Sequence, residues 1–199
     1  QSIGIASTWN PELVRQEAEV ISDEARALAN QLYNTKFLNF WSPMINMARD
    51  PRWGRVSEGY GEDPLVNSAF CEATVKGYQG NDLTASDTIA ACLKHFVGYG
   101  ESMAGVDYAY TDISERAMWE TYLPPFKTGV DVGAATIMTS FNDINGIPAV
   151  CNSYLIKEVL KKKWGFDGAI VSDWGAIRQL KNQGYSLDPL KCGSASLKA

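Results

Sequence analysis

The chain has 199 residues, and its 18 lysines and arginines against 23 aspartates and glutamates give a formal net charge of −5. This acidic balance argues against non-specific binding to nucleic acids or anionic membranes, which depends on clustered basic residues. Hydrophobic residues make up 45% of the chain, enough for a buried core and too many for an intrinsically disordered protein. No apolar run approaches the roughly 18 residues of a membrane span.

The cysteines and the single histidine argue against a metal centre. The four cysteines lie far apart and form none of the short Cys-x-x-Cys spacings of zinc or redox sites, so we expect buried free thiols. One histidine without clustered carboxylates gives no metal site, and we expect no cofactor. The sequence starts at Gln1 with no basic or apolar leader, so no secretion signal is identified and the cellular location stays open.

Helix and strand patterns alternate along the chain. Asn10-Pro11-Glu12 predicts a helix start, and apolar residues then repeat at helical spacing from Val14 to Leu32. A short apolar run at residues 37–41 predicts a buried strand. The next expected elements are a helix opened by Asp63-Pro64 and closed by Gly77 and Gly80, and a strand at 89–93. A capping box at Asp112 and Glu115 predicts a helix that runs into Pro124-Pro125 and can resume after them, before a strand at 134–138. The last expected elements are a helix capped by Asn152 or Ser153, a strand at 169–171 and a helical stretch within 175–199.

This alternation indicates the fold class. Strands that start near positions 37, 89, 134 and 168 and lack polar alternation are typical of a parallel α/β sheet covered on both faces. A closed (β/α)₈ barrel takes roughly 250 residues. We therefore expect a partial (β/α)₈ TIM-type barrel of about four βα units, truncated at both ends.

Polar clusters follow each predicted strand. Because the carboxyl ends of parallel strands meet at one edge of a sheet, these clusters are expected to surround one pocket. Their acid, lysine, histidine, arginines and aromatics suit a polyhydroxylated ligand, and a carboxylate can attack an anomeric carbon. The clusters are residues 49–55, 94–96, 140–143 and 172–174.

The same residues have structural interpretations. Arg49 and Arg52 could brace a loop by pairing with Asp50, Glu58 or Glu62, His95 could be a hydrogen-bonded core histidine, and Asp173 could cap the following helix. Lys94, at the end of an apolar strand, favours a polar pocket because a buried lysine needs a partner. Lys94 and His95 can face one pocket only if the backbone departs from regular strand geometry, so we expect a cis or strongly distorted peptide near Lys94, His95 or Phe96.

Seven strings, in order, resemble the N-terminal barrel domain of family 3 glycoside hydrolases, of the β-glucosidase type. The strings are residues 40–43, 49–55, 61–64, 94–98, 122–126, 140–146 and 171–174. The resemblance implies that Asp173 is the catalytic nucleophile. It also implies sugar contacts by Arg55, Lys94, His95, Phe141 and Trp174, with Phe141 standing where many members carry a tyrosine.

The resemblance further implies a function and a domain boundary. Residues 1–199 are expected to form an incomplete N-terminal catalytic domain, without an early sugar-binding aspartate, a last strand and the second domain that supplies the general acid/base in β-glucosidase-type members. A branch that uses an Asp-Ser-His loop instead is disfavoured by Asp107-Tyr108-Ala109. The expected activity is retaining hydrolysis of terminal non-reducing β-D-glucosyl residues of a β-glucoside or oligosaccharide, with the isolated fragment inactive. The location stays unknown, and the resemblance is compatible with a secreted or periplasmic protein.

Other functions remain open. A β-xylosidase of the same family and an inactive sugar-binding fragment fit the same residues. An aldolase-type barrel, with Lys94 as a Schiff-base amine, would need a glycine-rich phosphate loop that the sequence does not show.

Overall fold

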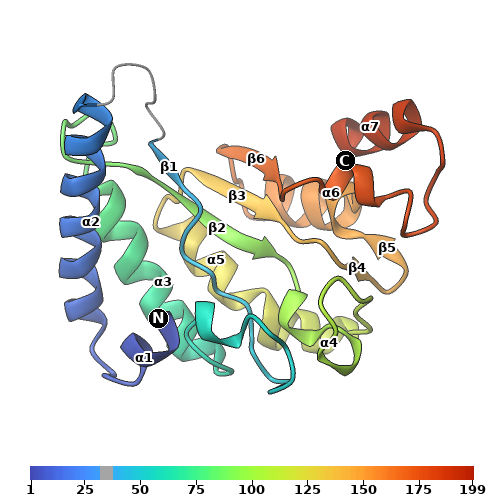
Figure 1. Ribbon diagram of the computed structural model, residues 1–199, viewed down its shortest axis with the longest axis horizontal. Helices are drawn as coiled ribbons and strands as arrows, with labels where there is room; N and C mark the ends of the chain where they lie inside the picture. The colour runs from blue at the N-terminus through green and yellow to red at the C-terminus, as the bar shows by residue number, and fades with distance from the viewer. Residues whose placement is uncertain (32–37) are drawn as a thin grey trace.

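The computed structural model describes residues 1–31 and 38–199, and its centre is a parallel sheet (Figure 1). Four strands lie in the order β1-β2-β3-β6, and every neighbouring pair runs parallel. The expected α/β class with a parallel sheet is confirmed. The expected helix end at Leu32 and strand start at residue 37 lie outside the described residues. The strands are β1 (Asn39–Phe40), β2 (Ala90–Phe96), β3 (Thr136–Thr139) and β6 (Ala169–Ser172).

Helices cover the sheet on the side of α3, which packs against α2, α5 and β2. The α-helices are α1 (Ser2–Ala6), α2 (Pro11–Gln31), α3 (Pro64–Gln79), α4 (Glu115–Ala117), α5 (Pro124–Asp131), α6 (Ala176–Gln179) and α7 (Pro189–Lys198). The other elements are the hairpin β4 (Asp143–Ile144) and β5 (Ile147–Pro148), 3₁₀ turns Val56–Glu58, Tyr99–Glu101, Met103–Gly105 and Ala149–Cys151, and π-helical segments Met118–Tyr122 and Tyr154–Lys163.

The start of α3 follows the local sequence, whereas the start of α4 does not. The Asp63 carboxylate accepts hydrogen bonds from the backbone N–H groups of Leu65 and Val66, as its position before a proline predicts. The predicted capping box at Asp112 is wrong, because Ser114 caps α4 instead. The reason is a long-range one: the backbone N–H of Ile113 donates to the side chain of Asn145, so the chain stays tied to the β4–β5 hairpin through residue 113.

Gly77 lies inside α3, whereas the sequence predicted that it closes the helix; only Gly80 does so. A Cβ atom at Gly77 would lie 2.5 Å from the Cβ of Ala18 and 2.5 Å from the carbonyl oxygen of Arg15, both on α2. The missing side chain therefore sets the close approach of α2 and α3, an advantage that outweighs the usual helix cost of glycine.

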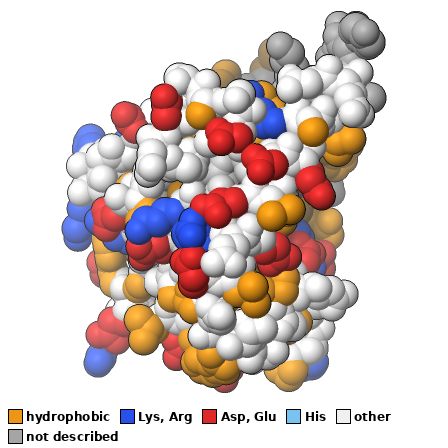
Figure 2. Space-filling view, turned by 90° about the vertical axis from the view of Figure 1, so that its left-hand side faces the viewer, with side chains coloured by type: hydrophobic (Ala, Val, Ile, Leu, Met, Phe, Trp, Pro, Cys, Tyr) orange, Lys and Arg blue, Asp and Glu red, His pale blue; other side chains and the backbone are white. Residues whose placement is uncertain are grey.

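The outer face of α2 is mostly polar but also exposes Leu13, Val20 and Leu28. Figure 2 shows acidic side chains scattered over this side of the molecule. Arg15 forms ion pairs with Glu12 and Glu19 on the same helix. Within residues 1–31 and 38–199, no helix is both long and apolar enough to span a membrane. All four cysteines are free thiols, and Cys71, Cys92 and Cys192 are buried.

The backbone at the end of β2 is irregular, as the sequence predicted. The Lys94–His95 and Phe96–Val97 peptide bonds are cis. The pairing register between β2 and β3 shifts between Leu93 and Phe96. The expectation of a cis peptide at this place is confirmed.

We expect Gly77→Ala to destabilise the protein by roughly 1–3 kcal/mol, the cost of overpacking a close contact. Urea unfolding followed by circular dichroism measures the change. Gly193→Ala is the matched control, because a Cβ built at that helical position meets no described residue within 4 Å apart from its chain neighbours and the backbone of its own helix. This variant should be neutral or slightly more stable. Equal stability of the two variants would contradict the packing role of Gly77.

Candidate active site

The polar clusters predicted from the sequence meet at one end of the sheet. His95 lies on β2, Asp173 directly follows β6, and Arg55 lies in the loop after β1. The Nε2 atom of His95 lies 3.3 Å from Oδ2 of Asp173 and 3.1 Å from Nη2 of Arg55. Three segments far apart in the sequence thus contribute to one cluster, as the carboxyl ends of parallel strands require.

The two carboxylate oxygens of Asp173 differ. Oδ1 accepts a hydrogen bond of 2.6 Å from the backbone N–H of Trp174, whereas Oδ2 is buried and has no hydrogen-bond partner. The side chain does not cap α6, whose N-cap is Gly175. An unpartnered oxygen on a buried carboxylate costs stability, so a structural role alone does not account for it.

Arg55 is held by a bidentate ion pair with Glu58. Its Nε and Nη2 atoms donate to the two carboxylate oxygens of Glu58 at 2.7 and 2.9 Å. The Nζ atom of Lys94 lies 4.0 Å from the same carboxylate. Glu58 therefore carries the counter-charge for two cations that face Asp173, and it holds Arg55 in one orientation.

Burial and neighbouring charges shift the ionisation of the cluster. Burial raises the pKa of Asp173, and this effect outweighs the opposing hydrogen bond from Trp174 and the charges of Arg55 and Lys94. Burial lowers the pKa of Lys94, partly offset by Glu58. Burial also lowers the pKa of His95 well below its ordinary value, with Arg55 and Lys94 acting in the same direction, so His95 is neutral at pH 7.

Aromatic side chains flank the charged cluster. The Trp174 side chain beside Asp173 is 80% exposed and so leaves an apolar surface open to a ligand. Phe141 is buried and packs edge-on against Tyr108, with ring centroids 4.7 Å apart. Tyr99 lies under the guanidinium of Arg55 at 5.3 Å and donates a hydrogen bond to Asp107. Tyr99 therefore links the charged cluster to the aromatic rings of Phe141 and Tyr108.

The remaining arginines of the first cluster have structural contacts. Arg52 pairs with Asp50 at 2.7 Å, as the structural interpretation predicted. Arg49 lies over the ring of Tyr122, 5.9 Å from its centroid. Trp53 is buried and packs edge-on against Tyr99. Of the three arginines, Arg55 alone contacts the histidine next to Asp173.

Two residues of the cluster were not predicted as site residues. Glu58 was considered only as a partner of Arg49 and Arg52. Asn46, 2% exposed, forms hydrogen bonds with both the backbone and the ring of His95. Its signal in the sequence is a single amide within the apolar run Met44-Ile45-Asn46-Met47, where an uncharged polar side chain needs a specific partner.

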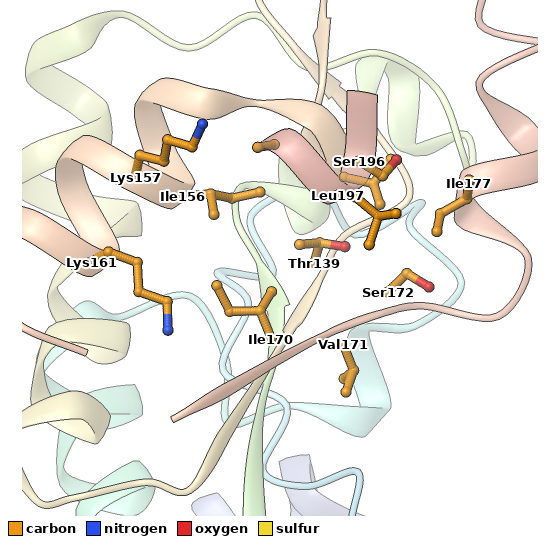
Figure 3. Close-up of a pocket in the computed structure, with 12 residues that line it drawn as sticks. Thr139, Ile156, Lys157, Lys161, Ile170, Val171, Ser172, Ile177, Ser196 and Leu197 are labelled. Carbon is orange, nitrogen blue, oxygen red and sulfur yellow. The ribbon is translucent and has the colours of Figure 1, made fainter. Parts of the chain in front are cut away.

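A groove of about 450 Å³ lies elsewhere, along β6 and α7 (Figure 3). It is lined mainly by aliphatic side chains, with Lys157 and Lys161 at one side. No aspartate or glutamate side chain lines it, so it offers no side-chain nucleophile or general acid of that kind. The groove therefore does not contain Asp173, the carboxylate that the sequence predicts as the nucleophile.

Comparisons with known proteins give a consistent set of similarities. The family description "Glycosyl hydrolase family 3 N terminal domain" matches residues 1–199. The chain is 39% identical over 198 residues to a periplasmic beta-glucosidase of Salmonella typhimurium, covering 100% of this chain and 25% of that protein. It is 39% identical over 189 residues to a beta-xylosidase of Formosa agariphila, covering 93% of this chain and 25% of that protein.

The solved structures show the same fold. A beta-glucosidase from Listeria innocua in complex with glucose matches with a TM-score of 0.93 and 38% identity, covering 99% of this chain and 27% of that chain. A mutant of the same enzyme in complex with laminaribiose matches equally well, with a TM-score of 0.93 and the same coverage of 99% and 27%. The chain spans about a quarter of the length of the curated relatives that it matches.

We expect Asp173→Asn to stabilise the protein by about 1 kcal/mol at neutral pH, because the amide removes a buried, unpartnered charge. The raised pKa of Asp173 means that the folded state binds this proton more tightly than the unfolded state, so the penalty is present above the raised pKa and disappears as the pH falls below the ordinary value. Thermal melts at several pH values measure the difference in melting temperature between Asp173→Asn and the wild-type protein. Asp167→Asn, at an exposed position, is the control and should change the melting temperature little.

Proposed function

Because the chain belongs to family 3 of the glycosyl hydrolases, we propose that it carries the nucleophile of a retaining β-glycosidase that removes terminal non-reducing β-D-glucosyl residues. The observation that supports this most directly is the unpartnered Oδ2 of Asp173, buried at the carboxyl end of β6 among Arg55, Lys94 and His95. A carboxylate with one oxygen held by a hydrogen bond and the other without a partner is suited to nucleophilic attack on an anomeric carbon.

In the proposed first step, Oδ2 of Asp173 forms a bond to the anomeric carbon as the bond from that carbon to the leaving oxygen breaks. The leaving oxygen takes a proton from a general acid, and a glycosyl ester of Asp173 results. Water, deprotonated by the same group, then attacks the anomeric carbon and frees the carboxylate. Two inversions give net retention.

The cations beside Asp173 support this cycle. Arg55 and Lys94 favour the ionised carboxylate, while burial keeps the carboxylate weakly solvated. The ammonium group of Lys94 and the guanidinium of Arg55 are also donors suited to sugar hydroxyls, and the exposed face of Trp174 suits the C–H surface of a pyranose ring. We propose Arg55, Lys94, His95, Phe141 and Trp174 as the residues that shape the sugar site.

The general acid/base is assigned to no residue of the described chain. Glu58, the other carboxylate of the ion-pair network, has a lowered pKa because Arg55 donates to it, so it stays ionised and cannot deliver a proton. We propose that a second domain supplies this group. We further propose that the sheet β1-β2-β3-β6, which is open at both edges among the described residues, is an arc of a (β/α)₈ barrel, and that residues 1–199 belong to an N-terminal catalytic domain in a periplasmic or secreted protein.

A β-xylosidase activity is the second candidate, favoured by the similarity to the Formosa agariphila beta-xylosidase. A xyloside lacks the hydroxymethyl group on C5, so the two substrates differ at one pocket. Comparing kcat/KM for aryl β-glucoside and aryl β-xyloside decides between them. Glucose binding by calorimetry without turnover of either substrate would instead favour a sugar-binding role.

Asp173→Asn should lower kcat by roughly 10³-fold or more, because an amide keeps the shape of the carboxylate but is a poor nucleophile. Hydrolysis of an activated aryl β-glucoside by the intact enzyme, with its proposed second domain, measures this. A 2-fluoro glycoside should label the peptide that contains Asp173, and mass spectrometry locates the ester. Asp167→Asn is the matched control; a labelled peptide elsewhere, or high residual activity of Asp173→Asn, would move the nucleophile.

Lys94→Met should move the acid limb of the kcat/KM profile to higher pH. The active form of Asp173 is ionised, activity is lost as pH falls through its pKa, and the charge of Lys94 lowers that pKa. Without this charge the limb moves up. A pH–rate profile measures it, with Lys162→Met at an exposed helix end as control; an unmoved limb would contradict the electrostatic role.

A further inference from the structure

The side chain of Asn46 forms hydrogen bonds with three atoms of a single residue, His95. Its Oδ1 atom accepts from the backbone N–H of His95 at 3.0 Å and lies 2.9 Å from the ring atom Nδ1. Its Nδ2 atom donates to the carbonyl oxygen of His95 at 2.9 Å. Asn46 is in place because the chain after β1 runs beside the end of β2, where Ile45 donates its backbone N–H to the carbonyl oxygen of Lys94.

The backbone contacts fix which end of the amide is oxygen. A peptide N–H only donates and a peptide carbonyl only accepts, so the amide atom that faces the N–H of His95 is Oδ1 and the one that faces its carbonyl is Nδ2. The opposite orientation would set donor against donor and acceptor against acceptor. Because Oδ1 has no proton, Nδ1 of His95 must carry the proton of their 2.9 Å contact.

The other ring nitrogen leads independently to the same tautomer. Nε2 lies 3.1 Å from Nη2 of Arg55, and a guanidinium group donates but does not accept. Nε2 is therefore the acceptor, without a proton. His95 is the neutral Nδ1–H tautomer, and both of its ring nitrogens are satisfied, which is consistent with its near-complete burial.

This tautomer determines what Asp173 can bind. Oδ2 of Asp173 lies 3.3 Å from Nε2, but neither atom carries a proton, so no hydrogen bond forms and Oδ2 stays unpartnered. We propose that Asn46 is a positioning residue that fixes the tautomer of His95 and so prevents the imidazole from donating a proton to the nucleophilic oxygen of Asp173. The inference rests on the proposed function only in calling that oxygen the nucleophile.

Charged and titratable groups approach this pair from several segments. Arg55 and Lys94 face both His95 and Asp173, and Glu58 faces Asp173 and pairs with both cations. The Tyr99 ring packs edge-on against the imidazole, 5.3 Å between centroids. Burial, with a smaller contribution from the charge of Asp173, raises the pKa of the Cys92 thiol. The two cations oppose a second proton on His95, and Asn46, which is neutral, adds no negative charge that would favour one.

Nitrogen-15 NMR of the ¹⁵N-histidine-labelled protein tests the tautomer without any assay of activity. The His95 signals are assigned by their loss in His95→Gln. We expect a protonated, pyrrole-type Nδ1 and an unprotonated, pyridine-type Nε2 at neutral pH. A proton on Nε2 in the wild-type protein, in either the neutral or the doubly protonated ring, would overturn the inference.

Asn46→Asp tests the consequence for the nucleophile. A carboxylate beside Nδ1–H favours the imidazolium form, so Nε2 gains a proton that it donates to Asp173. We expect an additional acid limb in the kcat profile at higher pH, below which the rate falls about tenfold per pH unit, together with a doubly protonated His95 by NMR. Asn152→Asp is the matched control, because it places the same change at a buried helix cap away from the cluster. An unchanged profile with an unchanged ring would contradict the inference.

The outcomes separate this inference from the proposed function. If Asn46→Asp does not fold, the wild-type spectrum still decides the tautomer. If the intact protein, with its proposed second domain, hydrolyses no glycoside and yet shows the Nδ1–H tautomer, the proposed function fails and the role of Asn46 toward His95 stands. If Asp173 is labelled and the proton lies on Nε2, the proposed function stands and this inference fails.

Discussion

The carboxylate of Asp173 is buried at the end of β6 with one oxygen unpartnered, and the polar structure around it follows from the cost of such a charge. Arg55 and Lys94 offset part of that cost. They in turn need Glu58, whose bidentate contact with Arg55 keeps the cations in place. Each charge in the cluster thus offsets the cost of another, starting from Asp173, and shifted pKa values of this kind are concentrated at functional sites.

The parallel order of the strands and the packing of the helices bring these groups together. Parallel order places the ends of β2 and β6 at one edge of the sheet, and β3 lies between them. Close helix packing supports that end of the sheet: Gly129 of α5 leaves room for Leu93 of β2, because a Cβ atom at Gly129 would collide with a methyl group of the leucine. The absence of a side chain at Gly129 therefore sets how closely α5 packs against β2, the strand that carries His95.

His95 connects the scaffold to the chemistry. Its backbone is bound by Asn46 and its ring is bound by Asn46 and Arg55, so the residue has no free polar atom among the described contacts. A histidine with both nitrogens satisfied is a fixed dipole rather than a proton donor or acceptor at neutral pH. Its neighbour Lys94 retains only a 4.0 Å contact with Glu58, which leaves its ammonium group the more available of the two for a ligand.

The sequence by itself determined the order of strands and helices, the parallel α/β class, the irregular backbone at Lys94–His95 and the gathering of Arg55, His95 and Asp173, because periodicity, capping residues and strand ends are local signals. The start of α4 at Ser114, the packing role of Gly77 and the grip of Asn46 on His95 were decided only by the tertiary structure. Each depends on a partner far away in the chain. Ile113 and Asn145 are 32 residues apart in the sequence, and Asn46 and His95 are 49 residues apart. Gly77 on α3 likewise packs against Ala18 on α2. Local patterns carry no information about such pairs, since only the folded chain brings them within contact distance.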